Sequence, residues 1–142
     1  MYDTILLPTD GSEGAHAAAE HAFDIARRYD GVVHVLYVAD TNRDSLTVVG
    51  DEAVDALEEE GQAVVEEVVR RAGSVGVETV TAVVQGGPHR TILDYVDEYG
   101  VDLVVMATHG RRGLERYLLG SVTERVVRTS PAPVLTVRTA ED

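Results

Sequence analysis

Short apolar runs alternate along the chain with longer stretches in which apolar residues recur every three or four positions. The short runs are rich in β-branched residues, which is typical of strands buried on both faces of a parallel sheet. Five strands are therefore predicted, at residues 4–7, 32–38, 77–84, 103–107 and 134–137.

The longer stretches predict four helices between these strands. The first helix follows the segment PTDGS at residues 8–12, where either Ser12 or Asp10 can cap it, and it ends at Asp30-Gly31. Its inner face consists of small alanines and one phenylalanine: Ala15, Ala18, Ala19, Ala22, Phe23 and Ala26. Small side chains of this kind allow a helix to lie close to a sheet.

The second predicted helix is long and acidic, at residues 51–72, and it follows a polar loop at residues 39–50. It contains Gly61, which costs about 1 kcal/mol of helix propensity. Its inner face is expected to comprise Val54, Leu57, Val64, Val68 and Ala72.

The third predicted helix begins at Pro88 and stops at Gly100, with an inner face of Ile92, Leu93, Val96 and Tyr99. The fourth has its apolar face at Leu114, Leu118, Val122 and Val126, and the segment GSVT at residues 120–123 either interrupts this helix or begins another.

Strands and helices alternate along the whole chain, from the first strand to the fifth. This alternation requires crossover helices, and hence an open, doubly wound, mostly parallel five-stranded sheet with helices on both faces. No linker, repeat or low-complexity segment interrupts the pattern, so we expect residues 1–142 to form a single α/β domain.

A glycine-rich turn, THGRRG at residues 108–113, follows the apolar run of the fourth strand. Glycines let the backbone approach an anion closely, and amides in such a turn or at a helix start point toward it. The segment is either a phosphate cradle, to which Ser121 and Thr123 add hydroxyl donors, or a plain loop with Ser121 as a helix cap. Arg111 and Arg112 either neutralise phosphates or face solvent. We expect His109 to be a loop residue.

The net charge of the chain argues against some classes of binding partner. The formal net charge is −13, from 25 acidic residues and 12 basic residues that are all arginine. A strongly negative chain repels nucleic acid and anionic membranes, so neither is an expected partner. The composition resembles that of halophilic archaeal proteins, in which salt screens a hydrated acidic surface.

Other features of the composition point to a cytoplasmic protein. No apolar run approaches the roughly 20 residues that span a bilayer, the start of the chain lacks the pattern of a signal peptide, and cysteine is absent. We expect no metal ligands, because no histidine and carboxylate cluster has ligand spacing.

Several segments together resemble the universal stress protein family over nearly the whole chain. The nucleotide-binding members of that family carry G-x2-G-x9-G-[S/T] after the fourth strand. The matching residues here are Ala107, Gly110, Gly120 and Ser121, so alanine replaces the first glycine. The opening LLPTDGS at residues 6–12 and the closing APVLTV at residues 132–137 are also similar to that family.

The resemblance implies a sheet of order 3-2-1-4-5 that binds ATP or another adenine nucleotide, with or without Mg²⁺. It implies that Pro8, Thr9 and Asp10 face the adenosine end and that Val38 contacts adenine. Met106 and Ala107 would line the ribose side. The phosphates would be held by Gly110, Gly120, Ser121, Val122 and Thr123. We place Arg111, Arg112 and Gly113 of the same glycine-rich region at the site as well.

Ala107 departs from the family pattern. If its backbone φ is negative, nucleotide binding survives the extra methyl group. If the position needs a positive φ, alanine costs about 1 kcal/mol or more.

Three functions remain open at this stage. The first is a nucleotide-binding regulatory or stress-response module, and the second is a slow ATPase. The third is a nucleotide-free dimerisation module. An efficient enzyme is not expected and no catalytic residue is assigned, because the chain lacks the GxxxxGK[S/T] loop and has no lysine clamp. The edge strand Val134–Val137 is expected to pair with a second copy as a homodimer.

Overall fold

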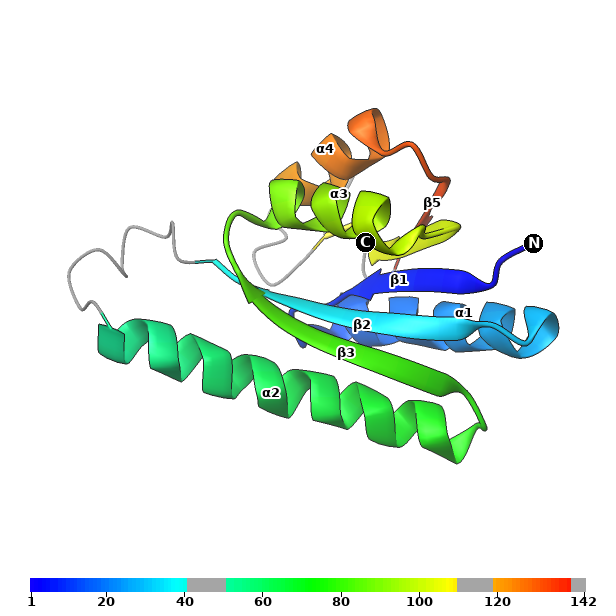
Figure 1. Cartoon of the computed structure of the whole chain (residues 1–142), viewed down its shortest axis with the longest axis horizontal. Coiled ribbons are helices and arrows are strands. Elements are labelled where there is room, and N and C mark those ends of the chain that lie inside the picture. Colours follow the sequence, from blue (N-terminus) through cyan, green and yellow to red (C-terminus); the bar gives the residue numbers. More distant parts are fainter. Residues whose placement is uncertain (41–50, 110–118, 139–142) are drawn as a thin grey trace.

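The computed structural model describes residues 1–40, 51–109 and 119–138 (Figure 1). Across these residues, five parallel strands form one sheet of order β3-β2-β1-β4-β5, which confirms the expected fold class and strand order. The strands are β1 Thr4–Pro8, β2 Val32–Ala39, β3 Glu78–Gln85, β4 Leu103–Ala107 and β5 Val134–Val137.

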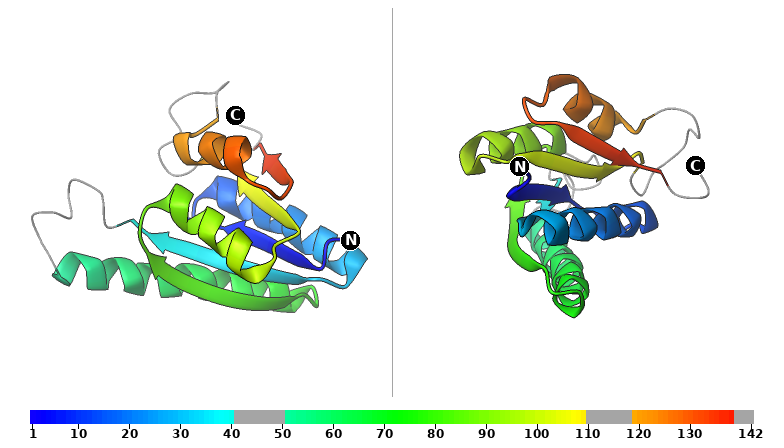
Figure 2. Two further views of the ribbon diagram at one scale, coloured as in Figure 1. Left: turned by 45° about the horizontal axis from the view of Figure 1, so that its top comes forward. Right: turned by 90° about the vertical axis from the view of Figure 1, so that its right-hand side faces the viewer.

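Two pairs of helices cover the two faces of the sheet (Figures 1 and 2). The helices are α1 Glu13–Tyr29, α2 Asp51–Ser74, α3 Pro88–Tyr99 and α4 Ser121–Thr129. The first core cluster joins α1 and α2 to the odd-numbered side chains of β1, Ile5 and Leu7. The second joins α3 and α4 to Leu6 and to Leu36 of β2.

Helix α1 has the alanine-rich inner face that its sequence predicts, and all six predicted residues are buried. Its end differs in detail. Asp30, with φ of 54°, is the left-handed residue, while Gly31 is needed for space. A Cβ at Gly31 would lie 2.6 Å from the carbonyl oxygen of Tyr2, so the glycine lets α1 return tightly to the start of β2.

The predicted inner face of α2 is partly wrong. Val65 is buried at 1% exposure, whereas the expected Val64 is only half-buried. Gly61 is buried too, and a Cβ there would lie 2.5 Å from Cδ1 of Tyr37 on β2. The glycine is therefore a packing requirement of the contact between α2 and β2, and not merely a local weakness of the helix.

Helix α3 begins at Pro88 and ends at Gly100, which is left-handed with φ of 60°, as predicted. Tyr95 is buried beside Ile92 and Val96, whereas the expected Tyr99 is 48% exposed, which corrects that assignment. Helix α4 begins at Ser121, so the segment at residues 120–123 starts a helix. Leu114 and Leu118 lie outside the described residues.

The carboxyl ends of β1 and β4 adjoin at the point where the chain changes direction across the sheet. β1 pairs with β2 on one side and with β4 on the other, with Ile5 opposite Leu103 and Leu6 opposite Val104. In open α/β sheets, ligands bind in the crevice outside such a switch point. No helix among the described residues is long and apolar enough to cross a membrane.

Candidate functional site

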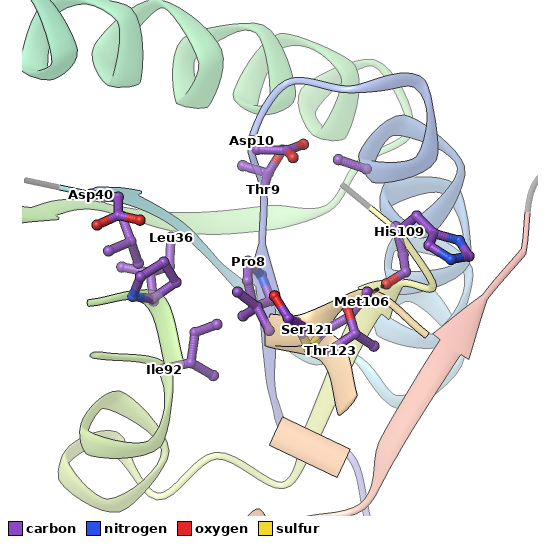
Figure 3. Close-up of a pocket in the computed structure, with 16 residues that line it drawn as sticks. Pro8, Thr9, Asp10, Leu36, Asp40, Ile92, Met106, His109, Ser121 and Thr123 are labelled. Carbon is purple, nitrogen blue, oxygen red and sulfur yellow. Dashed lines mark hydrogen bonds between the residues drawn. The ribbon is translucent and has the colours of Figure 1, made fainter. Parts of the chain in front are cut away.

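A cavity of about 400 Å³ opens at the carboxyl ends of β1, β2 and β4, between the starts of α3 and α4 (Figure 3). This size lies within the usual range for small-molecule sites, which is roughly 300–1,000 Å³. The lining residues are Pro8, Thr9, Asp10, Ala15, Leu36, Val38, Asp40, Pro88, Ile92, Met106, Ala107, His109, Gly120, Ser121, Val122 and Thr123.

The inner part of the cavity is apolar. Leu36 is fully buried, Ile92 is 2% exposed and Met106 is 6% exposed, and all three belong to the second core cluster. These side chains are held from both sides of the crevice, by β2 and α3 on one side and by β4 on the other. They form a surface suited to a flat apolar group, such as an aromatic base.

The loop after β1 is fixed by local hydrogen bonds. The Thr9 amide donates to the Leu36 carbonyl oxygen at 2.9 Å, which extends the pairing of β1 with β2. The Ser12 amide donates to Asp10 Oδ1 at 3.0 Å, and Ser12 Oγ accepts from the Ala15 amide at 3.2 Å. Ser12 is therefore the cap of α1, and Asp10 stabilises the turn that leads to it.

The start of α4 presents amides at the cavity. The first four N–H groups of any α-helix lack an intrahelical acceptor. Gly120 occupies the N-cap position and has no side chain to satisfy them. The amides of Ser121, Val122 and Thr123 therefore belong to a helix start that carries partial positive charge, and all three residues line the cavity.

Two expected phosphate donors are engaged within the protein. The Gly120 amide donates to the Thr108 carbonyl oxygen at 2.7 Å, so it already has an acceptor within the protein. The hydroxyl of Thr123 donates to the Ala107 carbonyl oxygen at 2.9 Å. Both bonds tie the first turn of α4 to the end of β4, and they orient the helix start rather than meeting an anion directly.

Ala107 does not need glycine's freedom. Among the described residues, Asp30 is the only non-glycine residue with positive φ, so Ala107 has a backbone conformation open to any residue. Gly120 also has negative φ, at −60°, so its backbone conformation does not require glycine. The replacement of the first motif glycine by Ala107 therefore costs no backbone strain.

Ten of the fourteen residues predicted for the site line this one cavity: Pro8, Thr9, Asp10, Val38, Met106, Ala107, Gly120, Ser121, Val122 and Thr123. Gly110, Arg111, Arg112 and Gly113 lie outside the described residues. Six lining residues were not predicted: Ala15, Leu36, Asp40, Pro88, Ile92 and His109. Alternation along β2 offers a signal for two of them, because Leu36, Val38 and Asp40 share one face of the strand.

Acidic side chains lie at the rim. Asp10 and Asp40 come from the ends of β1 and β2, and both are half-buried. Within the described ranges, no three His, Cys, Asp or Glu side chains gather as a metal site requires. The cavity thus combines an apolar inner surface, two carboxylates and one helix N-terminus.

The strand order and the cavity at the switch point define a doubly wound α/β protein with a candidate ligand cavity. The model of the universal stress protein family matches residues 1–138, and the chain belongs to this family. It is similar to universal stress protein MJ0531 of Methanocaldococcus jannaschii, with 39% identity, 97% of this chain covered and 83% of that protein.

Two solved structures are similar throughout their length. MJ0577, from the same archaeon, is 34% identical with a TM-score of 0.90, and the match covers 100% of this chain and 99% of that one. A universal stress protein solved in complex with cAMP is 26% identical with a TM-score of 0.74, and the match covers 98% of each chain.

Proposed function

We propose that this universal stress protein binds an adenine nucleotide, with ATP as the leading candidate, in the cavity between β1, β2 and β4. Binding would make it a nucleotide-dependent regulatory or stress-response module rather than an efficient enzyme. The observation that carries the proposal is the start of α4, where three helix amides lie on a cavity with an apolar inner surface.

The two ends of the cavity suit the two ends of a nucleotide. The phosphates would meet the amides of Ser121, Val122 and Thr123 and the Ser121 hydroxyl, because a helix N-terminus favours negative charge. The base would lie against Leu36, Val38 and Ile92. The ribose would lie between them, near Asp10 and the Met106–Ala107 end of β4; the range from 110 to 113 would complete the phosphate site.

The relative solved with cAMP supports this choice of ligand class, since cAMP is itself an adenine nucleotide. The Arg111 and Arg112 guanidinium groups would supply positive charge that the described lining lacks, and Mg²⁺ would accompany the phosphates. Hydrolysis would be slow at most, because the whole chain contains no lysine that could clamp a transferring phosphoryl group.

Calorimetric titration with ATP and MgCl₂ in molar KCl tests the proposal. Mass spectrometry of small molecules released from the purified protein provides a second measurement. We expect saturable binding, and we expect Gly120→Val to abolish it, because the branched side chain would occupy the phosphate space beside α4. Gly73→Val is a matched control, since nothing lies within 4 Å of a Cβ at that position.

Two results would overturn the assignment. One is the absence of any adenine nucleotide in both measurements. The other is unchanged ATP affinity in a Gly120→Val variant whose circular dichroism and melting temperature match those of the wild type. Accumulation of ADP over many turnovers would instead favour the alternative function, a slow ATPase.

We also propose that the protein forms a homodimer through β5, a terminal strand of the sheet. The outer edge of such a strand presents N–H and C=O groups that can pair with another chain. Sedimentation velocity tests this. The carbonyl oxygens of Pro133 and Val137 accept from β4, so the alternate residues Val134 and Thr136 turn their backbone groups to the outer edge. Thr136→Pro removes one backbone donor from that edge and should shift the protein toward monomer, whereas a monomeric wild type would contradict the proposal.

A further inference from the structure

Asp40 lies at the β2 end of the cavity. It continues the face of β2 that already carries Leu36 and Val38, because side chains two residues apart share a face of a strand. The backbone is fixed up to this point: Ala39 pairs with Gln85, and the Ala39 carbonyl oxygen accepts from the Gly86 amide at 3.1 Å. The backbone that leads to Asp40 is therefore held in the sheet, and Asp40 lines the cavity together with Leu36 and Val38.

The cavity is electrically polarised by this placement. In Figure 3, Asp40 lies on one side of Pro8, while Ser121 and His109 lie on the other side. The N-terminus of α4 attracts an anion, whereas the Asp40 carboxylate repels one. A nucleotide therefore enters with its phosphates toward α4, and its base occupies the region of Leu36, Val38 and Ile92, next to Asp40.

We propose that Asp40 is a specificity residue that accepts a hydrogen bond from the exocyclic 6-amino group of the purine base. The proposal deepens the proposed function and rests on it. A carboxylate only accepts hydrogen bonds and has about four acceptor positions, so it can receive one from a ligand in addition to contacts within the protein.

The chemistry of the base edge gives the selectivity. Adenine carries a donor, the 6-amino group, at the position where guanine carries the 6-oxo acceptor. An oxo group facing the Asp40 carboxylate would leave two acceptors opposed, without a proton between them. The site is therefore expected to favour adenine over guanine, and over a purine that lacks the 6-amino group.

A comparison of ATP with purine riboside 5′-triphosphate isolates this contact, because the two ligands differ only in the 6-amino group. We expect the wild type to bind ATP about tenfold or more tightly than the analogue, as a hydrogen bond to a charged acceptor implies. In Asp40→Ala the two affinities should become nearly equal. Asp40→Asn keeps one acceptor oxygen and should keep part of the preference.

The affinity ratio is the appropriate measurement, because removing a negative charge also strengthens the binding of any polyanion. Asp97→Asn on the exposed part of α3 removes the same charge away from the cavity, and it should leave the ratio unchanged. Adding GTP and 2′-deoxyATP to the titrations separates recognition of the base from recognition of the ribose.

Four outcomes would overturn the proposal. The first is equal affinity of the wild type for ATP and the analogue, and the second is an unchanged ratio of these affinities in a folded Asp40→Ala variant. The third is tighter binding of GTP than of ATP by the wild type. The fourth is that Asp40→Ala changes only the ratio of the affinities for ATP and 2′-deoxyATP. The first two leave nucleotide binding itself intact. If none of these ligands binds the wild type, both this assignment and the proposed function fail.

Discussion

Two hydroxyl groups in the first turn of α4 have different environments. Ser121 is exposed at the cavity, whereas Thr123 is 5% exposed and donates to the Ala107 carbonyl oxygen. Ser121 lines the cavity, whereas the Thr123 hydroxyl holds the helix against β4. Their chemical similarity in the sequence conceals this difference.

Substitutions at the two positions should therefore affect different measurements. Ser121→Ala should weaken ATP binding by about 1–3 kcal/mol, because a charged phosphate loses a donor, while stability hardly changes. Thr123→Val should lower the free energy of unfolding by about 1–3 kcal/mol, because it leaves the Ala107 carbonyl without this donor. Calorimetry and urea denaturation measure the two effects.

Thr123→Ser provides the control, since it keeps the hydroxyl and should restore most of the stability. The assignment fails if Thr123→Val is as stable as the wild type. It also fails if Ser121→Ala binds ATP normally.

At the residue scale, the ends of the strands decide which residues line the cavity. Pro8, Thr9 and Met106 lie at the cavity because the carboxyl ends of parallel strands meet at one edge of the sheet. The hydrogen bond of the Gly120 amide was not predictable, because its acceptor, Thr108, lies twelve residues earlier in the chain and is brought near only by folding. Asp40 follows the end of β2, in the segment predicted to be a polar loop, and its place in the cavity was not predicted.

At the scale of elements, the contact between α2 and β2 depends on a glycine, Gly61, which has no side chain. Gly61 faces the ring of Tyr37, which is 2% exposed and whose hydroxyl donates to Glu60 Oε2 at 2.6 Å. A Cβ at Gly61 would also lie 3.0 Å from Cγ1 of Val83 on β3. A ring held at both ends has little room to move.

Gly61→Ala should therefore destabilise the protein, although alanine is the better helix former. The substitution gains about 1 kcal/mol of helix propensity, but overpacking in a core typically costs about 1–3 kcal/mol. We expect a net loss of about 1 kcal/mol in urea denaturation. Gly73→Ala on the same helix meets no atom within 4 Å and should be neutral or stabilising, so a gain at both positions would contradict the packing argument.

Helix α3 is joined to β2 by a buried polar contact. His34 Nδ1 lies 2.6 Å from the hydroxyl of Tyr95, and the Tyr95 and Tyr99 rings stack with centroids 4.2 Å apart. Burial lowers the pKa of His34 below its ordinary 6.5, and burial together with the nearby Tyr99 and Glu98 raises the pKa of Tyr95 to about 12. Near neutral pH both groups are therefore uncharged, and one hydrogen bond joins them.

These pKa shifts predict a loss of stability in acid. The unfolded chain takes up a proton at His34 near pH 6.5, whereas the folded protein does so only at lower pH. The contribution of His34 is thus fully present above pH 6.5 and is lost as the pH falls toward the lower pKa of the folded state. The difference in unfolding free energy between wild type and His34→Gln, measured from pH 8 to pH 5, should shrink on acidification. A difference in unfolding free energy that does not vary with pH would contradict this prediction.

The elements themselves were largely predictable, because long apolar periods and turn residues such as Pro88 and Gly100 mark them. The rotation of each helix about its own axis was harder to predict from the sequence. Val64 and Val65 are both apolar, and only packing against β2 and β3 decides that Val65 is buried. The same applies to α3, where Tyr95 is buried and Tyr99 is not.

At the scale of the whole molecule, charge opposes folding. The net charge is −13, so like charges repel across the surface of the compact state. The ion pairs do not offset this strongly. Arg28–Asp24 and Arg128–Glu124, at 3.1 and 2.7 Å, join exposed side chains, and such pairs contribute about 0–1 kcal/mol each.

Salt should therefore stabilise the protein, because it screens many repulsions and weakens only a few attractions. The Debye length falls from about 10 Å at 0.1 M to about 3 Å at 1 M. We expect the melting temperature to rise by roughly 5 °C or more between 0.1 and 2 M KCl, corresponding to about 1 kcal/mol or more of stability. Differential scanning calorimetry measures this rise.

A variant with fewer negative charges separates screening from general salt effects. Glu59→Lys with Glu66→Lys changes two exposed positions of α2 and shifts the formal net charge from −13 to −9, since each substitution adds two units. This variant should melt higher than the wild type at 0.1 M KCl and gain less from added salt, because less repulsion remains to be screened. An equal rise of the melting temperature in both proteins would mean that salt acts through hydration of apolar surface. The acidic composition would then not explain the stabilisation by salt.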